Sequence, residues 1–244
     1  MSSHNQIKRI IIVGATSGIG RKMAELYAED GNIVGITGRR KELLDEIENM
    51  FPDKIKTECF DVTGNENIER LTALIQKTGG LDILVYSSGF GDLSKGLDWE
   101  LDKLTVNTNV YGFIQITNWA FNYFISQGHG SMAVISSIAA NRGNSLAPAY
   151  SASKAFQSNY FEALAIKTKK MKKDIGIICV EPGFVDTKMA KGKKRFWEAP
   201  VGKAARQIFK AIQKQKRKVY ITRRWVLIAW ALKWMPHFIL KRFA

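Results

Sequence analysis

A tyrosine and a lysine four residues apart are the first pair in this chain that could do chemistry. Tyr150 and Lys154 belong to the stretch YSASK, within an amphipathic pattern over residues 148–173. On a helix this spacing places both side chains on one face. A free tyrosine, with a pKa of about 10, is a weak acid–base catalyst at neutral pH. A nearby ammonium would stabilise the phenolate and lower that pKa, although such a pair taken alone is more often plain helix surface.

A glycine-rich stretch near the N-terminus could bind a phosphate. GATSGIG follows an expected strand over residues 8–13 and opens an expected helix over residues 19–30. Small residues let the backbone turn sharply beside a pyrophosphate, and the helix N-terminus offers free N–H groups to the anion. A tight turn without a ligand is the alternative, but the strand–loop–helix context favours a dinucleotide site. The candidate contacts are Gly14, Thr16, Ser17, Gly18, Ile19 and Gly20.

Two arginines follow the second expected strand and indicate which dinucleotide binds. An enzyme that uses NAD normally has an acidic residue here for the ribose 2′-hydroxyl, whereas this chain has Gly38, Arg39 and Arg40. A guanidinium can bind a 2′-phosphate through two hydrogen bonds, so the pattern predicts NADP(H). After the third expected strand, Asp61 could accept a hydrogen bond from the adenine amino group, with Val62 beside the ring. A helix-capping role for Asp61 fits equally well.

Short apolar runs alternate with amphipathic stretches along the chain. The alternation predicts an α/β fold of the Rossmann type, a doubly wound parallel sheet of about seven strands with helices on both faces. We expect one dinucleotide-binding and catalytic domain over residues 1–222, followed by a tail over residues 223–244. The strands are expected at 8–13, 33–37, 55–60, 83–86, 132–136, 175–180 and 219–222, and the helices at 19–30, 41–50, 65–78, 99–127, 148–173 and 200–215.

The composition excludes several classes of function. Lys and Arg total 37 against 22 Asp and Glu, and the resulting net charge of +15 favours anionic partners. No nucleic-acid-binding signature accompanies that charge, so we expect no nucleic-acid partner. The sequence has no His and Cys cluster that would suggest a metal site. Cys59 and Cys179 are expected to be buried thiols of a reducing compartment, and the N-terminus lacks a signal-peptide pattern, so a cytoplasmic protein is expected.

Together these motifs resemble the short-chain dehydrogenase/reductase family over roughly residues 7–222. The matching stretches are GATSGIG, YSSGF at 86–90, NVYG at 109–112, ISS at 135–137, YSASK at 150–154 and PGFVDT at 182–187. One departure is visible, because Ser87 and Ser88 replace the Asn and Ala that the family usually has before Gly89. These serines could brace the central strand differently without touching the groups that transfer protons.

The resemblance implies a role for each candidate catalytic residue. Tyr150 would be the general acid or base, and Lys154 would also bind the nicotinamide ribose. Ser137, chosen over Ser136 by its spacing to the tyrosine, would hydrogen-bond the substrate oxygen. Asn109 would hold a water near Lys154 and complete a proton relay. The further cofactor contacts implied by the resemblance are Ser88, Gly89, Pro182, Gly183, Val185 and Thr187.

The end of the chain is basic and rich in tryptophan. Its longest uninterrupted apolar run, Trp225–Leu232, is far shorter than the ~18 residues that span a bilayer. Tryptophans flanked by Arg and Lys suit an anionic membrane surface, which would make the protein peripherally membrane-associated. The alternatives are that the tail covers the substrate cleft or forms an oligomer contact. A basic lid over residues 188–200 could close over substrate, and its lysines could favour an anionic substrate such as an acyl carrier thioester.

The function expected from these features is reversible carbonyl reduction. We expect an NADP(H)-dependent oxidoreductase that interconverts a ketone or aldehyde and an alcohol by hydride transfer, with Tyr150 as general acid or base. If the tail binds membrane, the substrate is lipid-like. The family resemblance implies a homodimer or homotetramer. The alternatives are an NAD-linked dehydrogenase of the hydroxysteroid type and a non-catalytic protein that binds a dinucleotide or a membrane surface.

Overall fold

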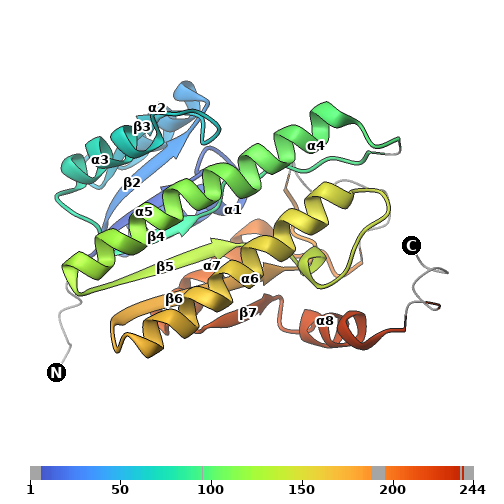
Figure 1. The fold of residues 1–244 in the computed structure, drawn as a ribbon. Coiled ribbons are helices and arrows are strands. Elements are labelled where there is room, and N and C mark those ends of the chain that lie inside the picture. Colours follow the sequence, from blue (N-terminus) through green and yellow to red (C-terminus); the bar gives the residue numbers. More distant parts are fainter. Residues whose placement is uncertain (1–6, 95, 188–195, 237, 239–244) are drawn as a thin grey trace.

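Seven parallel strands form one twisted sheet in the computed structural model, in the order β3-β2-β1-β4-β5-β6-β7 (Figure 1). The structure describes residues 7–94, 96–187, 196–236 and 238. This architecture confirms the predicted Rossmann-type fold. The strands are β1 (Arg9–Val13), β2 (Ile33–Gly38), β3 (Ile55–Cys59), β4 (Ile83–Tyr86), β5 (His129–Ile135), β6 (Asp174–Pro182) and β7 (Lys218–Ile221).

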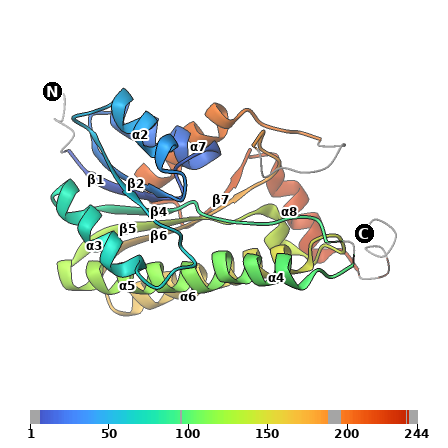
Figure 2. The ribbon, with the colours of Figure 1, turned by 90° about the horizontal axis from the view of Figure 1, so that it is seen from above.

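Helices cover both faces of the sheet, which is why the central strands are continuously apolar. Ile10, Ile11, Ile12 and Val13 of β1 are fully buried, and alternate residues enter opposite cores. Figure 2 shows α2 and α7 on one side of the sheet and α3, α5 and α6 on the other. The helices are α1 (Gly18–Glu29), α2 (Lys41–Met50), α3 (Asn67–Thr78), α4 (Trp99–Val106), α5 (Gly112–Gln127), α6 (Pro148–Lys170), α7 (Val201–Gln213) and α8 (Trp225–Trp234).

The long helix expected over residues 99–127 is interrupted by a π-helical turn. This turn, η1 (Asn107–Tyr111), joins α4 to α5 and carries Asn109. Gly112 follows it, where an added Cβ would collide with the backbone oxygen of Val62. Single π turns inside helices commonly occur at functional sites, because they re-aim one residue. Here the turn points the fully buried Asn109 toward the loop after β4.

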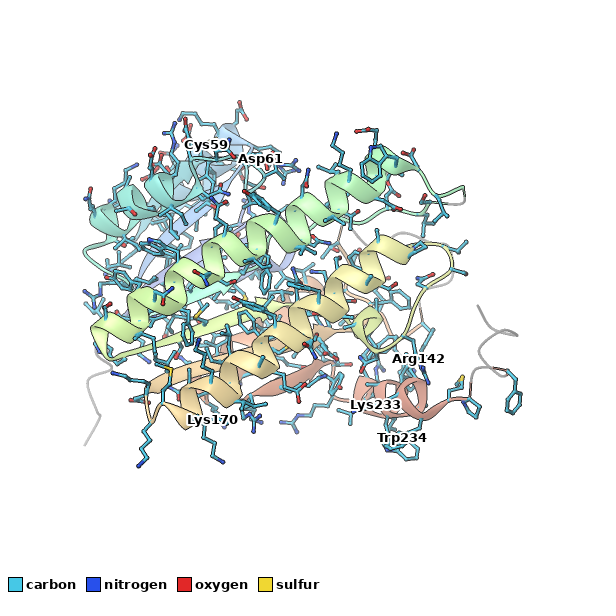
Figure 3. All side chains as sticks on the ribbon, in the orientation of Figure 1. Cys59, Asp61, Arg142, Lys170, Lys233 and Trp234 are labelled. Carbon is cyan, nitrogen blue, oxygen red and sulfur yellow. The ribbon has the colours of Figure 1, made fainter. Side chains whose placement is uncertain are left out.

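The two cysteines differ from the expectation in one respect. Both thiols are free, but Cys59 is exposed and only Cys179 is buried. The expectation that Cys59 is buried is therefore wrong. Its strand, β3, is the edge strand of the sheet, and Cys59 is the last residue of that strand. Figure 3 labels Cys59 at this outer edge, close to Asp61.

The order of the strands fixes where a ligand can bind. β1 lies between β2 and β4, so the chain crosses from one half of the sheet to the other at the β1–β4 boundary. In doubly wound sheets the ligand crevice lies at the carboxyl ends of the strands beside this switch point. The loops after β1 to β6, which hold most of the candidate site residues, all belong to that edge. Within the described ranges, every helix is too short or too polar to reach across a bilayer.

Candidate active site

A cleft of about 1430 Å³ opens at the carboxyl edge of the sheet. The predicted catalytic residues Ser137, Tyr150 and Lys154 line it, and so do the predicted cofactor contacts apart from Gly20. Asn109 lies behind the cleft wall, fully buried. The fold therefore gathers residues from six separate loops and one long helix around a single cavity.

The glycines of the first loop are required by close backbone approaches. Gly14 has φ +86°, and a Cβ there would lie 2.5 Å from the backbone nitrogen of Ser88. A Cβ on Gly20 would collide with the carbonyl oxygen of Gly14. The loop thus packs against the residues that follow β4 and against the first turn of α1. Gly20, in that first turn, is covered by the loop and therefore does not line the cleft. Only glycine adopts such a positive φ without strain.

The two arginines after β2 flank the same loop. Arg40 donates hydrogen bonds to the hydroxyl oxygens of Thr16 and, at 3.0 Å, Ser17. The Arg39 side chain is 60% exposed and lies 3.5 Å from an Asp61 carboxylate oxygen. Asp61 also accepts two hydrogen bonds from Thr63 at 3.0 Å and lines the cleft. The alternative of a helix-capping role is wrong, because α3 begins at Asn67 with Glu66 as its N-cap residue. Arg39 and Arg40 both line the cavity.

Tyr150 lies between the loop after β5 and the loop after β4. The Ser137 hydroxyl lies beside the Tyr150 phenol, and both side chains line the cleft. Gly91 faces the ring so closely that any Cβ there would overlap it. The Lys154 ammonium lies 5.8 Å from the centroid of the Tyr150 ring, one turn along α6. The predicted serine, tyrosine and lysine are therefore neighbours in space.

The Ser136 hydroxyl forms hydrogen bonds within the protein, so Ser137 is the serine whose hydroxyl is available to a substrate. The Ser136 hydroxyl donates to the carbonyl of Lys154 at 2.9 Å and lies 2.9 Å from the Ser158 hydroxyl. Ser158 in turn donates to the fully buried carboxylate of Glu181 at 2.9 Å, and Asn141 donates to its other oxygen at 2.8 Å. This network connects β5, α6 and β6, and it fixes the position of the end of β5 that leads into Ser137.

Burial dominates the ionisation of both proposed proton-transfer groups. Desolvation raises the pKa of the Tyr150 phenol, and the neighbouring Ser137 hydroxyl acts in the opposite direction. The net lowering expected from Lys154 is therefore wrong for this arrangement. Desolvation also lowers the pKa of Lys154 to about 8. At neutral pH the phenol is thus protonated and the ammonium still carries its charge for most of the time.

Gln157 is the residue of this site that the sequence analysis missed. It is fully buried, its side-chain oxygen accepts from the Lys154 ammonium at 3.0 Å, and its amide nitrogen donates to the Asn109 carbonyl at 2.9 Å. The lysine also donates to the Ile135 carbonyl at 3.0 Å. The Gln157 amide thus connects Lys154 to the backbone of Asn109, whose expected role of holding a water near Lys154 stays a prediction. An amide three residues after the lysine, on the same helix face, was the available signal.

The side chain of Asn109 holds the loop that packs on Tyr150. Its oxygen accepts from the Phe90 backbone nitrogen at 2.8 Å, and its amide donates to the Phe90 carbonyl at 2.7 Å and to the Ser153 hydroxyl at 2.9 Å. Phe90 precedes Gly91, which faces the tyrosine ring. Asn109 therefore positions the catalytic helix and the β4–α4 loop relative to each other.

The tail helix α8 forms part of the cleft wall. This agrees with one of the alternatives given for the tail, that it covers the cleft. Trp225 is 2% exposed and stacks so closely on Gly183 that a Cβ there would overlap it. Ile228, Leu232 and Met235 line the cavity beside it. Arg142, labelled next to α8 in Figure 3, donates to the carbonyls of Leu232, Lys233 and Met235 at the end of the helix.

Some of the predicted features lie outside the described residues. These are most of the lid, residues 188–195, and the end of the tail at 237 and 239–244. Of the lid, Phe196 and Trp197 are described, and their rings lie 5.1 and 6.1 Å from that of Trp225. In the part of the chain that the structure describes, no group of three His, Cys, Asp or Glu could hold a metal ion.

Known proteins share both the sequence pattern and this fold. A family model described as short chain dehydrogenase matches residues 8–197. An uncharacterized oxidoreductase of Myxococcus xanthus (strain DK1622) is 31% identical over 185 residues, which cover 73% of this chain and 72% of that protein.

Solved structures extend the likeness to the fold. The 3-ketoacyl-(acyl-carrier-protein) reductase from Brucella melitensis, complexed with NADH, has a TM-score of 0.77 at 22% identity and covers 87% of this chain and 95% of its own. The NADPH-dependent 3-quinuclidinone reductase from Rhodotorula rubra has a TM-score of 0.75 at 22% identity, covering 87% of this chain and 89% of its own.

Replacing Gln157 tests its place in the site. Gln157→Leu keeps a similar volume but removes one acceptor from the Lys154 ammonium and the donor to the Asn109 carbonyl. We expect the free energy of unfolding to fall by about 1–3 kcal/mol, the cost of leaving a buried polar group unpaired. Urea unfolding measures it, with Gln76→Leu on the exposed face of α3 as the matched control. Equal stability of the two variants would show that the bridge contributes nothing.

Proposed function

Because the chain belongs to the short-chain dehydrogenase/reductase family, we propose that it is an NADP(H)-dependent oxidoreductase acting on a lipophilic ketone or aldehyde. In this proposal the carbonyl is reduced to the alcohol, and the reaction is reversible. The observation that carries it is the placement of Ser137, Tyr150 and Lys154 side by side in the cleft. These residues lie between a wall suited to phosphates and a wall suited to apolar groups.

The first wall fits the phosphates of a dinucleotide. Backbone packs so closely at Gly14 and Gly20 that side chains are excluded, and the helix N-terminus of α1 follows directly. A Cβ on Gly18 would lie 3.3 Å from the Thr187 methyl, so the loops after β1 and β6 meet across the cleft. The guanidinium groups of Arg39 and Arg40 add positive charge. When bound, a reduced nicotinamide cofactor supplies the hydride for carbonyl reduction.

The second wall supports a lipophilic substrate. It belongs to the loops after β4, β5 and β6 and to α8, and it is closed by the aromatic cluster around Trp225. Apolar surface of this extent binds a hydrocarbon group by excluding water from it. The apolar residues that line it are Leu93, Leu146, Phe184, Ile228, Leu232 and Met235.

Tyr150 would supply the proton in the reducing direction. Its phenol stays protonated because burial raises the pKa, so it can donate to the oxygen that gains negative charge. The Ser137 hydroxyl donates a hydrogen bond to the same oxygen and orients the carbonyl. The Lys154 ammonium then stabilises the phenolate left on Tyr150. Gln157 and the Ile135 carbonyl hold that ammonium in place.

Arg39 supports the preference for NADP(H). An extended, exposed guanidinium with one long contact to Asp61 can turn toward a 2′-phosphate at little cost. Arg40 is already engaged by Thr16 and Ser17 and would hold the loop. Gly38 cannot be an acidic residue here, because even a Cβ would lie 2.5 Å from the Thr16 methyl group.

Tyr150→Phe tests the acid–base role. We expect NADPH oxidation over a panel of ketones and aldehydes to fall by about 10²–10⁴-fold, the usual contribution of a general acid. NADPH binding, followed by fluorescence, should persist because the ring remains. Tyr160→Phe, on the same helix but packed on Phe113 and Phe156, is the control and should keep its activity. Undiminished turnover in Tyr150→Phe would refute the proposed proton donor.

Arg39→Asp tests the choice of cofactor. Loss of a charge-assisted contact of about 1.5–3 kcal/mol should raise the KM for NADPH about 10–100-fold and leave the KM for NADH nearly unchanged. Arg206→Asp, an exposed change on α7, controls for the altered net charge. Steady-state kinetics with both cofactors measure the effect. If Arg39→Asp changes neither KM, or if the wild-type protein prefers NADH, the alternative of an NAD-linked hydroxysteroid-type dehydrogenase is favoured.

A further inference from the structure

The helix α8 exposes apolar side chains on the face that points away from the cleft. Leu227 is 69% exposed, Trp230 66% and Trp234 70%. Their spacing of three and four residues places them along one stripe of the helix. In Figure 3, Trp234 projects from the side of α8 that faces away from the sheet. A surface helix normally turns such a stripe toward the protein core. An apolar stripe exposed to water is unfavourable and marks a site of interaction.

The opposite face of α8 is already in use, so the exposed stripe is not a mispacked core. Trp225 and Ala229 are buried, and Ile228 and Leu232 line the cleft. The three hydrogen bonds from Arg142 fix the end of the helix. The contacts of its inner face and of Arg142 therefore fix the orientation of α8. Its outer face has no apolar partner among the described residues.

The charge around α8 indicates what could cover this face. Arg223 and Lys233 are both exposed; Arg223 lies two residues before α8 and Lys233 in its last turn. From Ala199 to the end, the sequence contains no Asp or Glu. Aromatic and aliphatic side chains bordered by cations match the boundary between headgroups and acyl chains of an anionic bilayer. Each cation near such a surface contributes about 1 kcal/mol.

The same charge disfavours a second copy of the chain as the partner. A two-fold contact through this face would pair the same patch of both copies, so the cations Arg223 and Lys233 of one copy would meet a patch that carries the same cations. The segment offers no carboxylate to neutralise them. An anionic lipid surface satisfies the apolar stripe and the cations at once.

We propose that the outer face of α8, defined by Leu227, Trp230 and Trp234 with Arg223 and Lys233, docks the protein on an anionic membrane surface. The helix lies parallel to that surface, with its apolar stripe at the level of the headgroups. Leu146 and Phe196, which are exposed and line the cleft, then bring the mouth of the cavity near the lipid. Entry of a lipophilic substrate from the bilayer rests on the proposed function, whereas the docking does not.

Co-sedimentation of the full chain with vesicles tests the docking. The vesicles are phosphatidylcholine with or without phosphatidylglycerol, and the variant is Leu227→Gln with Trp230→Gln. We expect the wild-type protein to bind the anionic vesicles and the variant to bind at least about tenfold more weakly, since each lost side chain contributes more than 1 kcal/mol. Arg223→Gln with Lys233→Gln should weaken binding to the anionic vesicles, and added salt should do the same.

A matched control distinguishes binding through the outer face of α8 from binding through any exposed apolar side chain. Met50→Gln with Ile166→Gln removes two exposed apolar side chains from α2 and α6 and should leave vesicle binding unchanged. The proposal is overturned if the wild-type protein ignores anionic vesicles or if the control loses binding equally. It is also overturned if light scattering shows that the α8 variant turns an oligomer into a monomer. NADPH binding and reduction of a water-soluble ketone, measured on every variant, distinguish failure of the docking from failure of the proposed enzyme.

Discussion

A positive charge buried in the wall of the cleft is the constraint on which the site depends. Lys154 is 3% exposed, and an unpaired ammonium in such a place costs several kcal/mol. Only two groups accept its hydrogen bonds in the described structure, the Ile135 carbonyl at the end of β5 and the Gln157 amide. The ammonium therefore fixes the spacing between β5, which leads to Ser137, and α6, which carries Tyr150.

The same constraint extends to the far side of α6. A buried amide needs a partner for its N–H group as well as for its oxygen. The Gln157 amide nitrogen therefore donates to the backbone carbonyl of Asn109, which lies in the π turn. The Asn109 side chain then holds the backbone of Phe90 beside Tyr150. A single chain of hydrogen bonds thus runs from the sheet, through the lysine and the glutamine, to the loop that covers the tyrosine. It orders the cleft before any ligand binds, which lowers the cost of binding.

The sequence predicted the parts of this arrangement that are local. GATSGIG implies a strand–loop–helix turn by itself, and the i, i+4 spacing of Tyr150 and Lys154 requires only a helix. The bridge that Gln157 makes depends on the tertiary fold, because its second partner lies 48 residues earlier, on a π turn that interrupts what the sequence pattern predicts as one continuous helix. The exposure of Cys59 depends on the strand order, and the orientation of α8 depends on Arg142, whose contacts are about ninety residues away.

The charge on Lys154 should control the rate, and the pH dependence of carbonyl reduction tests this most directly. Desolvation sets the pKa of Lys154 at about 8, below that of a free lysine, so the ammonium is lost as the pH rises through that value. The phenolate then loses its stabilising charge. We predict that kcat/KM falls as the pH rises through about 8 and that the residual activity of Lys154→Met lacks this limb. A wild-type rate that stays level well above that pH, or an unchanged limb in Lys154→Met, would contradict the account.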